Sequence, residues 1–161
     1  MSAGASPSGR YLGLDLGLRR IGVALSDSLG LTAGPLTVIE RSSSAQAAEA
    51  IERLVKAHDV ETIVIGLPLT LRGSRGSQAQ RVESFAALLR ARVAVPIVLI
   101  DERLTTVQGE RSLLEAGVSR DVRKKAIDQV AAQIILQHYL DTQREAARRK
   151  AAQEDSDAPS E

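Results

Sequence analysis

Three carboxylates lie in stretches of sequence that are otherwise apolar. Asp15 interrupts the run Leu12-Gly-Leu-Asp-Leu-Gly17, Glu102 follows the apolar run 97–100, and Asp128 lies in a helix-like segment rich in Ala, Ile and Val. Ionised carboxylates are rarely drawn into a core without partners, because desolvating an unpaired charge is costly. Three acids that converge would hold a cation, and ligands made only of oxygen favour Mg²⁺ or Mn²⁺ over zinc.

Each acid also has an explanation that involves no chemistry. Asp15 beside a glycine is typical of a capped turn, and Glu102 of a solvated loop acid that pairs with Arg103. Asp128 suits the first turn of a helix, where the dipole favours negative charge. One metal site accounts for all three acids together, whereas these explanations need a separate reason for each.

Basic residues flank the proposed metal site in the sequence. The glycine-rich loop 66–77 joins a strand-like run to a helical pattern, so it can offer backbone N–H groups to a phosphate, although a flexible linker has the same composition. It lacks the Gly-Lys-Ser/Thr of a Walker loop. A second basic run, 120–125, precedes Asp128, and such runs are often only solvated helix faces. The bases expected to contact a nucleic-acid backbone are Arg72, Arg75, Arg81, Arg103, Arg123, Lys124 and Lys125.

The composition narrows the classes of function. The chain has 161 residues, of which 43% are hydrophobic, enough for one globular domain. Cysteine is absent, which excludes disulfides, thiolate zinc sites and cysteine catalysis. The net charge is +1, but four acids lie beyond the last base, and the rest of the chain carries about +5. Aromatic residues make up only 2%, so stacking of bases on aromatic platforms is not expected.

Five strand-like runs and two helical patterns precede Glu102 and would position the acids. Short spacers predict antiparallel pairing of the first three runs, and the helical patterns that separate the later runs predict parallel pairing. We therefore expect an α/β fold with a five-stranded mixed sheet, an antiparallel three-stranded meander plus two parallel strands, flanked by helices. The expected strands are 11–16, 20–25, 36–39, 62–65 and 96–100, and the expected helices are 45–57, 78–92, 105–115 and 122–141.

The ends of the chain differ from its middle. Residues 1–9 are small and polar, are expected to be disordered, and do not form the pattern of a signal peptide. Residues 10–141 form the expected domain. Residues 142–161 lack a large apolar side chain and are expected to be a charged tail that frays or is disordered.

Four ordered blocks of the sequence resemble a known family. They are residues 11–24 around Asp15, residues 66–86 with Gly73 and Gly76, the segment Asp101-Glu-Arg-Leu-Thr-Thr106, and residues 128–137. Together they are similar to the bacterial YqgF family, also called RuvX, of pre-16S rRNA nucleases and Holliday junction resolvases. The resemblance implies a ribonuclease H-like fold, a cytoplasmic location, maturation of the 5′ end of 16S rRNA, and a site made of Asp15, Glu102 and Asp128.

These observations predict a metal-dependent nuclease that hydrolyses phosphodiester bonds, as a monomer or homodimer without membrane contact, with pre-rRNA or a pre-ribosomal particle as its partner. A resolvase of four-way DNA junctions would use the same acids in a two-fold dimer. An ATPase of the sugar-kinase or actin type also suits Asp15-Leu-Gly17, but it needs two such domains. A nucleic-acid-binding module without catalysis would bind independently of metal and of Glu102.

Overall fold

A five-stranded mixed sheet forms the centre of the computed structural model, which describes residues 9–68, 76–102 and 120–157. The strand order is β3-β2-β1-β4-β5. The first three strands pair antiparallel, whereas β4 pairs parallel with β1 and with β5. The predicted mixed sheet is therefore confirmed. The strands are β1 (Arg10–Leu16), β2 (Arg20–Ser26), β3 (Ala33–Glu40), β4 (Val60–Leu67) and β5 (Ile97–Asp101).

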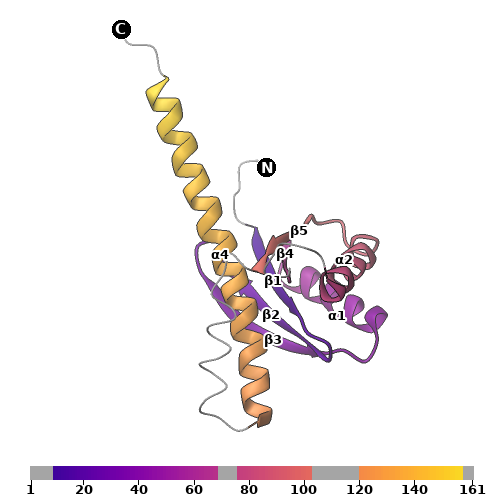
Figure 1. Ribbon diagram of the computed structural model, residues 1–161. Coiled ribbons are helices and arrows are strands. Elements are labelled where there is room, and N and C mark those ends of the chain that lie inside the picture. Colours follow the sequence, from indigo (N-terminus) through magenta and orange to yellow (C-terminus); the bar gives the residue numbers. More distant parts are fainter. Residues whose placement is uncertain (1–8, 69–75, 103–119, 158–161) are drawn as a thin grey trace.

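Within the described residues, three helices cover the two faces of this sheet (Figure 1). The helices α1 (Ser44–Ala57) and α2 (Ser77–Arg90) lie on one face, and α4 (Arg120–Ser156) crosses the other. The hydroxyl of Ser43 caps α1 by accepting a hydrogen bond from the backbone of Gln46 at 3.1 Å. The predicted helix 105–115 and most of the predicted N-terminal extension lie outside the described residues.

Alternating side chains of β1 divide the core in two. Leu12 and Leu14 point towards α1 and α2 and join the larger apolar cluster. The other face of the sheet forms a second cluster with α4, in which Tyr11 of β1 packs against Tyr139 with 5.8 Å between ring centroids. Gly13 and Asp15 belong to this second face, as the two-residue period predicts.

Small residues let α4 lie directly on the sheet. A Cβ atom on Gly22 would lie 2.0 Å from the backbone oxygen of Asp128, and one on Gly13 would lie 2.7 Å from Cβ of Leu136. A methyl group at position 22 therefore has no room unless the helix moves. The place where α4 meets β2 is also the place where the helix carries Asp128.

Two glutamines fix the position of α4 along its own axis. The side chain of Gln133 donates to the carbonyl of Ala33 at 3.0 Å. The side chain of Gln137 accepts from the backbone N–H of Ala33 at 2.9 Å and donates to the carbonyl of Leu31 at 3.0 Å. These bonds satisfy backbone groups at the start of β3, and they oppose sliding of the helix over the glycines.

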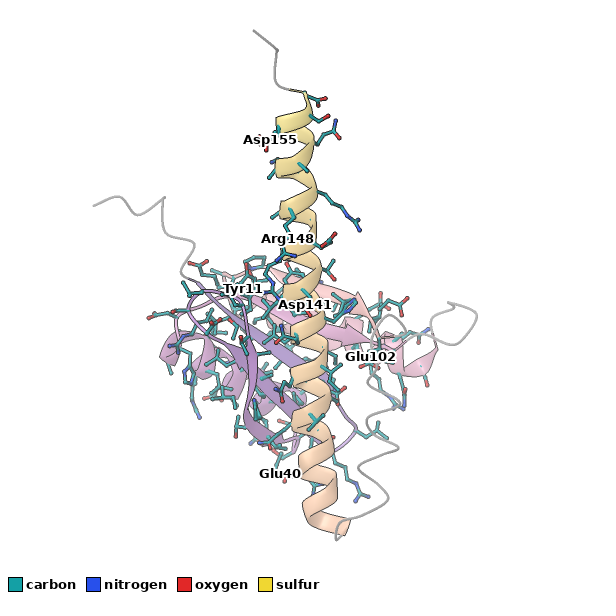
Figure 2. All side chains as sticks on the ribbon, turned by 90° about the vertical axis from the view of Figure 1, so that its left-hand side faces the viewer. Tyr11, Glu40, Glu102, Asp141, Arg148 and Asp155 are labelled. Carbon is teal, nitrogen blue, oxygen red and sulfur yellow. The ribbon has the colours of Figure 1, made fainter. Side chains whose placement is uncertain are left out.

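The predicted frayed tail after residue 141 is wrong, because α4 continues without interruption to Ser156. Figure 2 shows Arg148 and Asp155 on the part of the helix that projects past the sheet. The side chains of this part are exposed, so packing does not hold it. Its Ala, Arg, Lys, Gln and Glu residues favour helix, the packed turns before it nucleate it, and ion pairs such as Arg149 with Glu145 at 3.3 Å add support.

No helix in the described ranges combines the length and the apolar character that a membrane span requires.

The close contact under α4 gives a test of stability. We expect Gly22→Ala to lower the free energy of unfolding by about 1–3 kcal/mol, because the added methyl group meets backbone atoms of the helix rather than a flexible side chain. Gly34→Ala is the matched control, since a Cβ atom at that position of β3 would have none of the described atoms within 4 Å. Denaturant unfolding measures both variants. Equal midpoints for the two variants would contradict the proposed packing constraint.

Candidate active site

Asp15, Glu102 and Asp128 line one pocket at the end of the sheet where β1, β4 and β5 terminate. The pocket has a volume of about 310 Å³. Asp15 is 3% exposed and Glu102 is 7% exposed, whereas Asp128 is half-buried. The fold thus brings together three acids that are far apart in the sequence, and their chemical role stays a prediction.

Gly22 connects the positions of two of these acids. It is the partner of Asp15 in the register between β1 and β2, and it lies directly under the backbone of Asp128. The strand pairing and the helix contact therefore place Asp15 and Asp128 at the same point of the sheet. Neither acid lies in an irregular loop, so both positions are set by regular hydrogen-bonded elements.

Glu102 reaches the pocket from the next residue after β5. A Cβ atom on Gly66 would lie 2.7 Å from Oε1 of Glu102 and 2.6 Å from Cδ1 of Ile135. The glutamate side chain therefore lies over β4 at Gly66, beside α4, and it uses the space that a larger residue would fill. Because β4 lies between β1 and β5, this path brings Glu102 towards Asp15.

Two arginines line the same pocket. Arg81, one of the predicted nucleic-acid contacts, enters it from the second turn of α2. Arg41, which follows β3, was not predicted, because a lone arginine before three serines carries no recognisable motif. Arg72, Arg75 and Arg103 lie outside the described residues, as do the side chains of Arg123, Lys124 and Lys125.

The oxygen donors of the pocket suit Mg²⁺ or Mn²⁺ by their chemistry. Among the described side chains, no three Asp, Glu or His residues are already gathered closely enough to hold a metal ion. This arrangement still fits Mg²⁺, which keeps several water ligands and takes only one or two carboxylates together with substrate phosphates. The donor set therefore fits an ion that enters together with its substrate better than a closed structural site.

Neither arginine of the pocket is paired with an acid within the described part of the chain. Arg20 pairs with Glu40 at 3.3 Å, whereas the described contacts of the Arg41 side chain are with the carbonyl of Gly17 and the ring of Phe85. The described lining of the pocket thus carries two arginines beside its three acids. This combination suits a ligand that brings its own negative charge, such as a phosphodiester.

Two bacterial proteins are similar to this chain over most of its length. A protein from Moorella thermoacetica is 52% identical over 132 residues, covering 82% of this chain and 94% of its own length. A protein from Halalkalibacterium halodurans is 53% identical over 136 residues, covering 83% and 97%. Both bear the name "Putative pre-16S rRNA nuclease".

Among solved structures, RuvC from T. thermophilus in complex with a Holliday junction substrate is similar in fold. Its TM-score is 0.56 at 14% identity, with 84% of this chain and 96% of that chain covered. At this identity the likeness concerns the fold alone, and it agrees with the expected ribonuclease H-like architecture. The family model for RuvX, described as Holliday junction resolvase, matches residues 9–142. This match and the two relatives with more than half of the aligned residues identical show that the chain belongs to the RuvX family.

Proposed function

We propose that this protein is a divalent-metal-dependent nuclease that hydrolyses phosphodiester bonds at the 5′ end of pre-16S rRNA. The observation that carries this proposal is the convergence of Asp15, Glu102 and Asp128 in one pocket that also holds two arginines. The choice of pre-16S rRNA rests on the names of the two bacterial relatives.

In this proposal, Asp15, Glu102 and Asp128 hold Mg²⁺ or Mn²⁺. When bound, the ion polarises the scissile phosphate, lowers the pKa of a water molecule and stabilises the leaving oxygen. The burial of Asp15 and Glu102 keeps both carboxylates oriented and limits the water around them, which strengthens their electrostatic interactions.

The start of α2 provides the binding side of the pocket. Gln78 and Arg81 line the pocket from the first turns of this helix. The N-cap residue, Gly76, has no side chain that could accept from the first backbone N–H groups. These N–H groups and the guanidinium of Arg81 are suited to a phosphate group of the substrate.

Water is the nucleophile in the proposed reaction. The described residues that line the pocket include no Ser, Thr, Cys, His or Tyr, and the proposal assigns its three carboxylates to the metal ion rather than to covalent attack. Attack by water on phosphorus breaks one P–O bond, and the leaving oxygen takes up a proton.

A side-by-side assay tests the substrate and the site together. We expect purified protein with Mn²⁺ or Mg²⁺ to cleave an RNA that spans the 5′ end of 16S rRNA faster than a four-way DNA junction. Asp15→Asn should reduce that cleavage more than about 100-fold, because it removes a charged ligand from the pocket. Glu61→Gln is the control, since Glu61 is exposed and lies near the opposite end of β4.

The family description favours junction resolution as the second function. Faster, symmetric cutting of the DNA junction by a two-fold dimer would support it and would contradict the rRNA assignment. Full metal-dependent cleavage of either substrate by Asp15→Asn would contradict the proposed site itself.

Removal of divalent cations gives a second prediction. EDTA should abolish cleavage, and Mn²⁺ or Mg²⁺ should restore it. Because three ligands are not gathered beforehand among the described side chains, substrate phosphate should complete the ion's ligands. The half-saturating Mn²⁺ concentration in rate measurements should therefore fall as the RNA concentration rises. A half-saturating value independent of RNA would indicate a site that is already complete without substrate.

Gly66→Ala tests the position of Glu102 separately from the stability of the fold. The added methyl group meets side-chain atoms of Glu102 and Ile135, whereas the methyl group of Gly22→Ala meets backbone atoms. We expect a small change in the thermal midpoint and a loss of cleavage of about tenfold or more, because the carboxylate is displaced. Cleavage and thermal unfolding are measured together, with Gly34→Ala as the control. Unchanged cleavage would argue against a role for the present position of Glu102.

A further inference from the structure

We propose that Arg41 binds a phosphate of the nucleic-acid backbone in the pocket of Asp15, Glu102 and Asp128. This assignment rests on the proposed nuclease function and adds to it a substrate-binding residue. Arg41 belongs to none of the sequence blocks around the three acids. It reaches the pocket only because β3 ends near the turn between β1 and β2.

Two contacts hold the guanidinium of Arg41 in place. Its Nη1 donates to the carbonyl oxygen of Gly17 at 3.1 Å, and its Cζ lies 5.4 Å from the centroid of the Phe85 ring. The backbone N–H of Arg41 also donates to the carbonyl of Arg19 at 2.8 Å. The side chain has therefore lost much of its rotamer freedom before substrate arrives, which reduces the entropic cost of binding.

Most donors of this guanidinium stay available for a ligand. A guanidinium has five N–H groups, and the contact with Gly17 uses one nitrogen. None of the described carboxylates forms an ion pair with Arg41. A planar fork of donors that is fixed in a pocket suits the two unbridged oxygens of a phosphodiester.

Arg81 supports the assignment through its place on α2. Arg81 and Phe85 are four residues apart, so they lie on the same side of the helix. The ring that carries Arg41 is thus next to the second arginine of the pocket. Both arginines can contact one stretch of the nucleic-acid backbone. Without them, the three acids of the pocket would repel its phosphates.

The alternative role for Arg41 is structural, as a clamp that joins the β1–β2 turn to α2. Arg90 offers a matched comparison, because its Nη2 donates to the carbonyl of Ile97 at 3.2 Å but the residue does not line the pocket. Both arginines therefore make one hydrogen bond to a backbone carbonyl, and only Arg41 faces the proposed substrate.

The decisive experiment compares Arg41→Gln with Arg90→Gln in cleavage of the same single-stranded RNA at several salt concentrations. We expect Arg41→Gln to lower kcat/KM about tenfold or more, mainly by raising KM, because a hydrogen bond to a charged group is lost. The slope of log KM against log salt should become shallower by about 0.7, the value for one phosphate contact on a single strand. Arg90→Gln should change neither quantity.

A slope and KM for Arg41→Gln equal to those of Arg90→Gln would overturn the assignment. If Asp15→Asn inactivates the protein while Arg41→Gln does not, only the role of Arg41 fails. If Asp15→Asn stays fully active, the proposed nuclease site fails, whatever Arg41 does.

A measurement on the wild-type protein covers the case in which Arg41→Gln does not fold. Phenylglyoxal modifies accessible arginines, and mass spectrometry locates the modified residues. In EDTA, where the RNA stays intact, bound RNA should slow the modification of Arg41 but not of Arg90. Equal modification of Arg41 with and without saturating RNA would also overturn the assignment.

Discussion

The contact between the backbone of α4 and Gly22 of β2 is the constraint on which the rest of the site depends. The backbone oxygen of Asp128 occupies the space that any side chain at position 22 would need. Because Gly22 also pairs with Asp15, this one contact sets the relation between a helix and the central strand. The glutamines at positions 133 and 137 then prevent the helix from shifting along the sheet. The relative position of Asp15 and Asp128 is therefore set by backbone packing rather than by interactions between charged side chains.

Glu102 is held differently from the other two acids. Asp15 and Asp128 are fixed by a strand and a helix, whereas Glu102 lies one residue beyond β5 and depends on the open space over Gly66. Glu102 is only 7% exposed, so burial of the side chain, rather than strand pairing, orients its carboxylate. The site thus combines two carboxylates positioned by regular elements with one positioned by the burial of its side chain at the end of a strand.

Much of this fold could be predicted from the sequence, because its strands are short apolar runs and its first helices have clear apolar faces. The period of β1 placed Asp15 on the face opposite Leu12 and Leu14, where the structure has it. Arg41 could not be predicted, since its importance comes from Gly17 and Phe85, which only the tertiary fold brings near. The length of α4 was also missed, because apolar periodicity reports packing and the last turns of this helix pack against nothing described.

The projecting end of α4 provides an attachment point for a probe. From Asp128 to Ser156 the helix rises about 42 Å at 1.5 Å per residue, and its last turns lie beyond the segment that matches the family. A fluorophore or surface anchor attached near Ser156 would thus be carried by the helix, well away from the pocket. Because the same helix carries Asp128, the orientation of its projecting end depends on how α4 packs against Gly13 and Gly22 of the sheet. Single-molecule orientation measurements can follow the geometry of the site from a point that does not line the pocket.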